Sequence, residues 1–292
     1  INYNVKRAVQ LGIPVEKALQ MATIQPAKCY GLYQLGMIAP GRQADFVIID
    51  NVTDLNVVDV YHCGKKIIKD EKMEVKPCPP HLKNTVHVSG FSEERLKLKH
   101  SGEKAHVIQM LEKQIVTKHI IEEVPCAEKD GEKYFESNEE YQKIAVIERH
   151  KNTGKMGVGI VKGYGIRGGA IASSVSHDSH NIIVVGDNDH DMALAVKEMI
   201  RTQGGYTLVG NGKIYGTLPL PVMGLMSDAG YENVNEALAR MIPKAHEMGV
   251  KDGFDPFITL SFMALPVIPE IRITPRGIYL VNEDRMIRTP FD

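Results

Sequence analysis

Apolar residues recur at helical spacing at the start of the chain. Val5, Ala8 and Val9 share one face of a predicted helix, because residues three and four apart lie on the same side. Gly12 is expected to end this helix, and Pro14 to open a second one. The apolar residues of the second helix are Val15, Ala18, Leu19 and Ala22.

The pattern then becomes typical of strands. Residues 45–50 form an almost unbroken apolar run, which predicts a buried strand, and residues 57–63 are expected to pair with residues 66–68 across a turn at Gly64. Residues 70–101 lose this period and gain charge and proline, with Pro77, Pro79 and Pro80 close together. Such composition is typical of a connecting segment.

A second domain is expected beyond this segment, with strands and helices in mixed order. We predict strands at residues 106–111, 115–121, 144–150, 170–172 and 182–185, a glycine-rich stretch at 154–169, a helix at 191–202, a hairpin of 206–209 with 213–218, and a last helix at 236–248 that Pro243 interrupts.

Two familiar motifs occur in this second domain, and neither fits its context. Residues 163–168 read GYGIRG and match the GxGxxG turn of dinucleotide sites, but a helix should follow that turn and the next residues do not predict one. Residues 187–198 place acidic side chains at four positions of a calcium loop, but Met192 stands where the loop needs glycine. We expect Asp187 or Asp189 to cap the helix instead.

A polar cluster between two predicted strands is the strongest candidate for function. Imidazole, carboxylate, hydroxyl and amide groups fall within six residues, a composition suited to proton transfer or to hydrogen bonding a polar heterocycle. Two histidines three apart could also bind a metal, and a polar surface turn that bonds its own backbone remains an open interpretation. His119 and Cys126 are expected to be packing or surface residues. The candidate residues are His177, Asp178, Ser179, His180 and Asn181.

Composition places the chain among ordinary globular proteins. Hydrophobic residues make up 43%, charged residues 24%, and the formal net charge is −1, so nucleic acid is not an expected partner. The four cysteines lack CxxC spacing, which predicts a reducing, cytoplasmic location without a disulfide framework. No apolar stretch predicts a membrane span. Because the chain opens at Ile1 inside a helical pattern, we expect a partial polypeptide.

Two short segments resemble the metal-dependent amidohydrolases. Residues 35–47 (LGMIAPGRQADFV) are similar to the stretch by which these enzymes return from their barrel to a small β-sandwich. Residues 21–27 (MATIQPA) are similar to the family's Ala-Thr-x-Asn-Pro-Ala helix start, with Gln25 in place of the usual Asn. Further along, residues 173–185, 218–221 with 224–227, and 259–262 with 264–269 resemble the extra C-terminal domain of adenine deaminases, which hydantoinases and dihydroorotases lack.

The resemblance implies hydrolytic deamination of adenine to hypoxanthine and ammonia, in purine salvage. In that family a metal-bound hydroxide attacks C6 of the purine. The resemblance implies that a binuclear centre of Mn or Fe would supply this hydroxide. The family's ligands, including a His-x-His and a late-barrel Asp, lie upstream of Ile1, so no metal ligand or catalytic residue is assigned within this chain. Adenine, the N-terminal barrel portion of the same enzyme and further copies in a homo-oligomer are the expected partners.

The expected fold class is α/β with α+β. Residues 1–35 would be the last helices of a (β/α)8 barrel, 36–90 part of the β-sandwich, 91–104 a linker, and 105–292 the C-terminal mixed α+β domain. We expect residues 177–181 to face the barrel mouth, where active sites of this architecture lie, and to bind purine or close the site. Another cyclic amidohydrolase and a noncatalytic assembly module remain alternatives.

Overall fold

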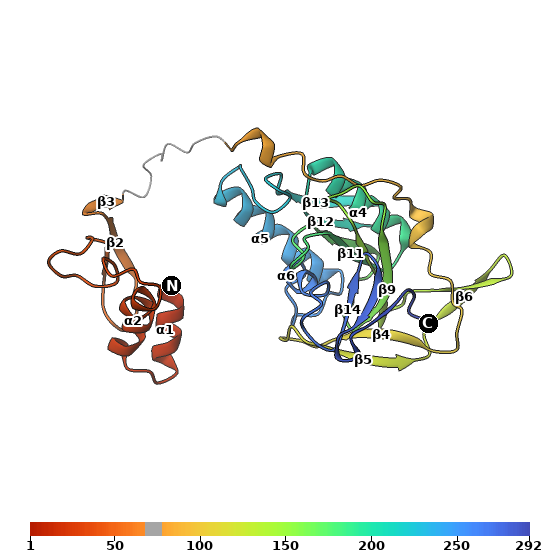
Figure 1. Ribbon diagram of the computed structural model, residues 1–292, viewed down its shortest axis with the longest axis horizontal. Coiled ribbons are helices and arrows are strands. Elements are labelled where there is room, and N and C mark those ends of the chain that lie inside the picture. Colours follow the sequence, from red (N-terminus) through yellow and green to blue (C-terminus); the bar gives the residue numbers. More distant parts are fainter. Residues whose placement is uncertain (68–77) are drawn as a thin grey trace. The chain divides into compact units, whose positions relative to one another are not determined.

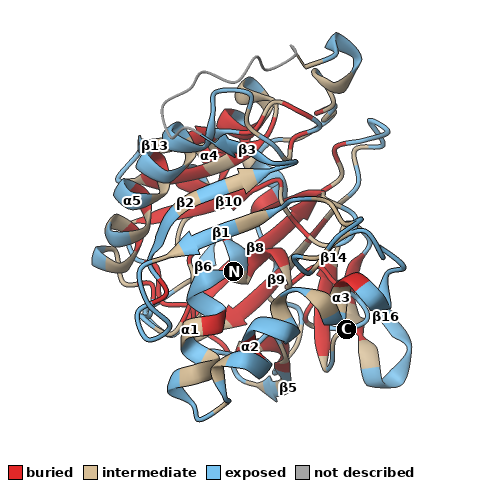
Figure 2. Cartoon of the chain, turned by 90° about the vertical axis from the view of Figure 1, so that its left-hand side faces the viewer, coloured by how far each residue is buried: buried red, intermediate tan, exposed pale blue. Residues whose placement is uncertain are grey.

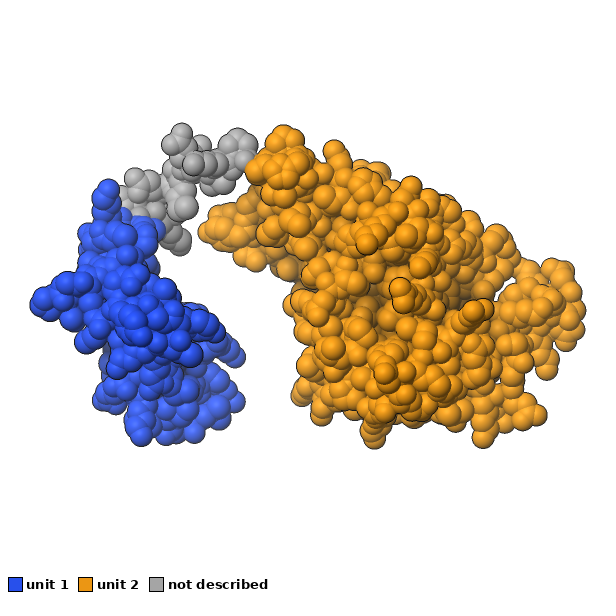
Figure 3. All heavy atoms as spheres, viewed as in Figure 1, with its two compact units in different colours: residues 1–76 blue, residues 77–292 orange. Residues whose placement is uncertain are grey.

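The computed structural model describes residues 1–67 and 78–292, and the chain divides into two compact units at residue 76 (Figures 1 and 3). Residues 70–77 of the predicted connecting segment, and Ile68 at the end of a predicted strand, lie outside the described residues. Both units mix helices with sheets, in agreement with the expected mixed class. The boundaries expected at residues 35, 90 and 104 stay a prediction.

The first unit places three short helices before a small antiparallel sheet. Its core is small and centres on Val5, Ala18 and Leu55. The sheet has the order β1-β2-β3. The elements are α1 (Asn2–Gln10), α2 (Val15–Ala22), α3 (Ile24–Cys29), β1 (Phe46–Ile49), β2 (Val57–His62) and β3 (Lys65–Ile67).

The second unit is built on an eight-stranded sheet of order β13-β12-β10-β11-β8-β9-β4-β5, antiparallel except for β4 beside β9. Its strands are β4 (Ala105–Met110), β5 (Thr117–Glu122), β8 (Tyr141–Ile147), β9 (Met156–Lys162), β10 (Gly169–Ser173), β11 (Ile182–Gly186), β12 (Gly205–Gly210) and β13 (Lys213–Pro219). The other elements are η1 (Pro80–Leu82), η2 (Glu93–Leu96), the hairpin β6 (Cys126–Lys129) and β7 (Glu132–Phe135), α4 (Asp189–Thr202), α5 (Tyr231–Glu247), α6 (Ile258–Ser261), η3 (Val281–Glu283), and the small sheet β14 (Ile271–Thr274), β15 (Gly277–Leu280) and β16 (Arg285–Ile287).

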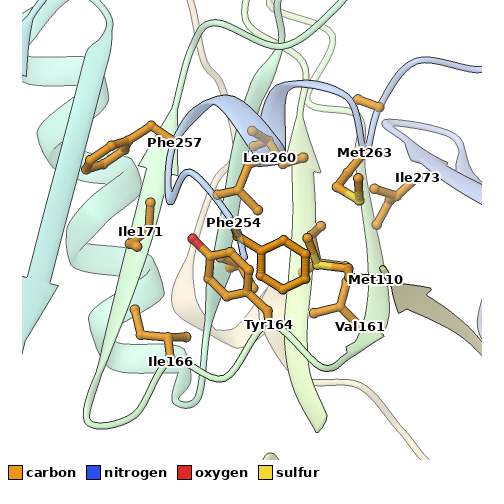
Figure 4. Close-up of a cluster of buried hydrophobic side chains, with 14 of the residues drawn as sticks. Met110, Val161, Tyr164, Ile166, Ile171, Phe254, Phe257, Leu260, Met263 and Ile273 are labelled. Atoms are coloured by element: carbon orange, nitrogen blue, oxygen red, sulfur yellow. The ribbon is translucent and has the colours of Figure 1, made fainter. Parts of the chain in front are cut away.

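The central strands β8, β10 and β11 of the large sheet are buried on both faces, which explains why they are apolar without alternation. Along β8, Ile144 and Val146 belong to the cluster that includes residues of α5, α6 and β14, while Ala145 and Ile147 belong to the cluster that includes α4. Figure 2 shows β8 and β10 as buried strands. The larger cluster contains Tyr164 and Phe254, whose rings stack at 6.2 Å between centroids (Figure 4).

The glycine-rich stretch contains a strand, β9, that the sequence pattern does not predict. A Cβ on Gly157 would lie 2.1 Å from the carbonyl oxygen of Thr274, and one on Gly159 would lie 3.2 Å from Ile273. Glycine therefore lets the small sheet β14-β15-β16 approach β9 closely.

Two predictions for the helices were wrong in detail. Pro243 lies inside α5, which continues to Glu247, because Ala237, Met241 and Ala245 bury one face of the helix and packing outweighs the lost backbone hydrogen bond. The N-cap of α4 is Asn188, whose side chain accepts a hydrogen bond from the backbone N–H of Asp191.

In the described parts of the chain, no helix is both long and apolar enough to cross a bilayer. All four cysteines are free, as expected. Leu96 in η2 is fully buried and this short helix contacts α4, so part of the predicted connecting segment packs against the second unit.

Candidate functional site

The polar cluster forms a short loop between two buried neighbouring strands, β10 and β11. The loop thus brings together all five residues predicted from the sequence. Asp178 and Ser179 are exposed, His177 and His180 are half-buried, and Asn181 is buried. The exposed and half-buried side chains are available for contact with a ligand, whereas the side chain of Asn181 is buried and its Oδ1 accepts a hydrogen bond from the backbone N–H of Arg149 at 3.3 Å.

Buried serines support the start of this loop. The hydroxyl of Ser174 donates to the carbonyl of Gly224 at 2.6 Å and accepts from the backbone N–H of Gly205 at 2.7 Å. The hydroxyl of Ser173 donates to the carbonyl of Val175. Ser173 and Ser174 are fully buried, so these hydrogen bonds fix the backbone that enters the loop.

A buried arginine holds the end of the loop. Arg149 is 1% exposed, and its Nε donates to the carbonyl of His180 at 2.5 Å. The same guanidinium donates to the carbonyls of Thr85 at 3.3 Å and Met223 at 3.0 Å. Burial lowers the pKa of Arg149 to about 10, which still leaves it charged at neutral pH. Arg149 is therefore a cation that ties three segments together through their carbonyls.

The three segments that carry the adenine deaminase resemblance meet at this loop. The backbone N–H of His177 donates to the carbonyl of Ser261 at 2.8 Å, and the rings of His177 and Phe262 lie 5.2 Å apart. Through Ser174 the loop also contacts Gly224. Residues 173–185, 218–227 and 259–269 thus build one local structure.

The two histidines of the loop lie edge to face, with ring centroids 5.6 Å apart. Burial lowers the pKa of His180 below its usual 6.5, and the nearby His177, Arg149 and His150 add to this effect. His180 is therefore a neutral imidazole at physiological pH. Its Nδ1 is buried without a hydrogen-bond partner among the described residues, and the same holds for the hydroxyl of Ser176.

The described residues do not offer the ligands of a binuclear metal centre. One group among them could hold a single ion: Asp45, His62 and Cys63, all exposed in the first unit, with ligand atoms within 4.8 Å of one another. In this group His62 Nδ1 lies 3.0 Å from a carboxylate oxygen of Asp45. His177 and His180 form no such group with a third ligand in the part of the chain that the structure describes.

The two familiar motifs have structural roles. The backbone N–H groups of Gly168 and Gly169 donate to the carboxylate of Asp187, at 2.5 and 3.0 Å. The protein's own anion thus occupies the donors that a phosphate would need, and strand β10 follows in place of a helix. The carboxylate of Asp191 accepts a hydrogen bond from the backbone N–H of Gly212. This residue of the calcium-loop pattern therefore stabilises the turn between β12 and β13.

Sequence reasoning did not identify Arg149 or the histidine pair of β4 and β5. Arg149 was included in a predicted strand, and the sequence gives no sign that it is buried, since Glu148 separates it from the apolar run that ends at Ile147. His106 Nδ1 lies 2.7 Å from His119 Nε2, and burial lowers the pKa of both rings. No periodicity reveals that pair, because the strand register brings it together.

Comparison with known protein families gives two matches. Residues 114–285 match the adenine deaminase C-terminal domain, and residues 1–86 match the amidohydrolase family. The first match covers more than half of the chain.

Curated relatives agree with these matches. An adenine deaminase of Desulfitobacterium hafniense is 50% identical over 288 residues, which cover 99% of this chain and 50% of the relative. Adenine deaminases of Nitratidesulfovibrio vulgaris (41% identical) and Halalkalibacterium halodurans (42% identical) each align with 97% of this chain and 49% of their own length. The chain spans about half the length of the curated relatives it matches. It belongs to the family of the adenine deaminase C-terminal domain, preceded by an amidohydrolase segment.

Proposed function

We propose that this chain is the C-terminal part of an enzyme that hydrolyses adenine to hypoxanthine and ammonia. The observation that carries the proposal is the 50% identity to a protein named adenine deaminase across 99% of the chain. Because the chain spans half of that relative, the catalytic metals, Mn or Fe, would be bound mainly by the other half. The complete enzyme would be a homo-oligomer.

The first unit supports the idea that another stretch of polypeptide covers it. Its buried core is small, and large apolar side chains are exposed on its helices, strands and turns. Exposed apolar surface of this extent is typical of an interface. These exposed residues include Ile1, Tyr3, Leu11, Met21, Ile38, Val47, Val52 and Val58. In the proposal, residues 1–35 complete a barrel and the following strands complete a β-sandwich.

The local contribution of the second unit is the 177–181 loop, which we place at the mouth of the barrel. A neutral His180 offers one donor and one acceptor, which suits the ring nitrogens and exocyclic amine of a purine. His177 adds an aromatic surface beside Phe262. Asp178 and Ser179 are exposed and add further hydrogen-bonding groups. The loop would therefore orient adenine or exclude water from it.

The test replaces His177 and His180 by alanine in the complete enzyme and follows ammonia release from adenine. We expect each change to lower kcat/KM by about tenfold or more, the loss of one good hydrogen bond to a substrate. His87→Ala is the matched control, because His87 is exposed and its side chain makes no hydrogen bond in the described structure. Urea unfolding should be unchanged in all three variants.

The outcomes separate the parts of the proposal. Unchanged kinetics in both loop variants would remove the role of the loop while leaving the deaminase function intact. A complete enzyme that releases no ammonia from adenine, but hydrolyses a cyclic amide, would replace the substrate assignment. If no barrel-bearing half exists in the cell, the chain would be a noncatalytic assembly module, and reading the coding region upstream of Ile1 decides this.

A further inference from the structure

A separate cleft of about 820 Å³ lies on the second unit, within the volume range typical of small-molecule sites. It is formed by the turn between β8 and β9, the turn between β14 and β15, and the segment after α6. The side chains that matter for its chemistry are Lys151, Lys155, Arg276, Glu148, Tyr279 and Met286.

The charges of this cleft are mainly positive. Lys151, Lys155 and Arg276 are exposed, and none of them makes an ion pair or side-chain hydrogen bond with the rest of the described chain. One carboxylate, Glu148, also lines the cleft. Unpaired cations in a concave surface raise the local concentration of anions.

Glu148 does not compete for these cations. Its carboxylate accepts hydrogen bonds from the backbone N–H groups of His150, Lys151 and Thr153 and from the hydroxyl of Thr153. Burial opposes its ionisation, but these donors lower the pKa of Glu148 to about 2. Glu148 therefore organises the turn that carries the two lysines, and its oxygens are already occupied.

Hydrogen bonds also fix the backbone of the two turns that form the cleft. Arg95 donates to the carbonyl of Gly154 at 2.8 Å, and Ser89 donates to the carbonyl of Asn152 at 2.9 Å. Opposite, Arg276 lies in a tight turn whose backbone N–H donates to the hydroxyl of Thr274. A backbone fixed before binding reduces the entropy that a ligand must overcome.

The remaining lining is apolar and aromatic. Tyr279 is half-buried and its hydroxyl is held by Asp284 at 2.5 Å, so its polar end already has a partner. Pro266, Val267, Pro275 and Met286 complete the apolar part. A fully hydrophilic anion would leave this surface unused.

We propose that this cleft binds a small phosphorylated molecule that carries a flat ring, of the chemical class of a purine nucleoside monophosphate. The lysines and Arg276 would pair with the phosphate, since guanidinium and ammonium groups are the usual phosphate donors. Tyr279 and the neighbouring apolar side chains would contact the ring. The site is a pocket of limited volume in a chain of net charge −1, which favours a small molecule over a nucleic acid.

The cleft shares Asn181 with the 177–181 loop, but the cations and the ring proposed to bind the ligand lie outside that loop. Asn181 lines the cleft, and the Nε2 of His150 lies 2.7 Å from the carbonyl oxygen of Ser179. The proposal goes beyond the deaminase function and does not depend on it, because binding is measured without turnover.

The test is calorimetric titration of the 292-residue chain with AMP, adenosine and inorganic phosphate, repeated on the complete enzyme. We expect AMP to bind at least about tenfold more tightly than adenosine, since a charged hydrogen bond is worth about that factor. Phosphate should compete with AMP, and added salt should weaken the binding of AMP.

A pair of double variants locates the site. The double variant Lys151→Gln with Arg276→Gln should weaken the binding of AMP by about tenfold or more and leave the binding of adenosine unchanged. Lys118→Gln with Lys197→Gln removes the same charge from two exposed lysines that lie outside the cleft, and AMP binding should persist. All four positions are on the surface, and circular dichroism of each variant confirms the fold.

Three results would overturn the proposal. The first is that AMP and adenosine bind equally well or that neither binds at millimolar concentration. The second is an equal loss in the two double variants, which would mean general charge attraction. The third is binding to the chain that disappears in the complete enzyme, because the other half would then occupy the cleft.

Discussion

Arg149 should contribute more to stability than any exposed charge of the second unit. Truncation to alanine removes the donors of three carbonyls, those of Thr85, His180 and Met223. Each buried acceptor left without a donor costs about 1–3 kcal/mol. Entry of water offsets part of this, and burial of the cation itself is unfavourable. We therefore expect Arg149→Ala to lower the free energy of unfolding by about 3 kcal/mol.

Arg149→Lys tests whether the shape of the guanidinium matters. Lysine keeps the charge but offers a single ammonium in place of a planar fork, so it reaches fewer of the three carbonyls. We expect a loss of about 1–2 kcal/mol, intermediate between arginine and alanine. A lysine variant as unstable as alanine would show that charge contributes nothing at this position.

Urea unfolding followed by circular dichroism is the suitable assay, because the chain contains no tryptophan. The chain has two compact units, so two transitions are expected, and Arg149→Ala should move the transition of the second unit alone. For a unit of this size the expected loss corresponds to a decrease in Tm of roughly 6–12 °C. Arg240→Ala is the control, since Arg240 is exposed on α5. A loss below about 1 kcal/mol in Arg149→Ala would refute the reasoning.

Three further predictions concern the same unit. Gly224→Ala should lower the free energy of unfolding, measured in urea, by about 1–3 kcal/mol more than Gly131→Ala does. Both glycines have positive φ, but a Cβ at Gly224 would lie 2.7 Å from the guanidinium of Arg149, whereas a Cβ at Gly131 would meet open space. Asn188→Ala should lower the free energy of unfolding by about 1 kcal/mol through loss of the α4 cap, and an unchanged urea midpoint would contradict this. The free energy of unfolding should fall as the pH drops below 6.5, because histidines with lowered pKa values bind fewer protons in the folded state than in the unfolded state. Urea titrations between pH 7.5 and 5 measure the change. A free energy of unfolding that stays constant over this range would contradict the prediction. These histidines are His106, His119 and His180.

Local patterns predicted much of the second unit because they reflect local physics. The hairpin of β12 and β13 follows from strand propensity on both sides of a Gly-Asn-Gly turn. The position of the 177–181 loop between two strands follows from apolar runs on both sides of a polar segment. The mismatch of the GxGxxG turn was also visible, because no helical pattern follows it.

The sequence did not predict features that depend on tertiary partners. Gly157 reads as a loop residue until Thr274 of another sheet is placed against it. Pro243 reads as a helix breaker until the apolar face of α5 is buried. The clamp by Arg149 needs carbonyls from positions 85, 180 and 223, which no local window contains.

The loop separates positions that maintain the fold from positions free to act on a ligand. Ser174 and Arg149 fix its two ends through buried hydrogen bonds, so changes there should alter stability and activity together. Between them, Asp178 and Ser179 are exposed, and His180 has an Nδ1 atom without a partner in the described residues. Under the proposed role of the loop, His180 contacts adenine in the complete enzyme, so His180→Ala should lower activity by more than any change in stability explains.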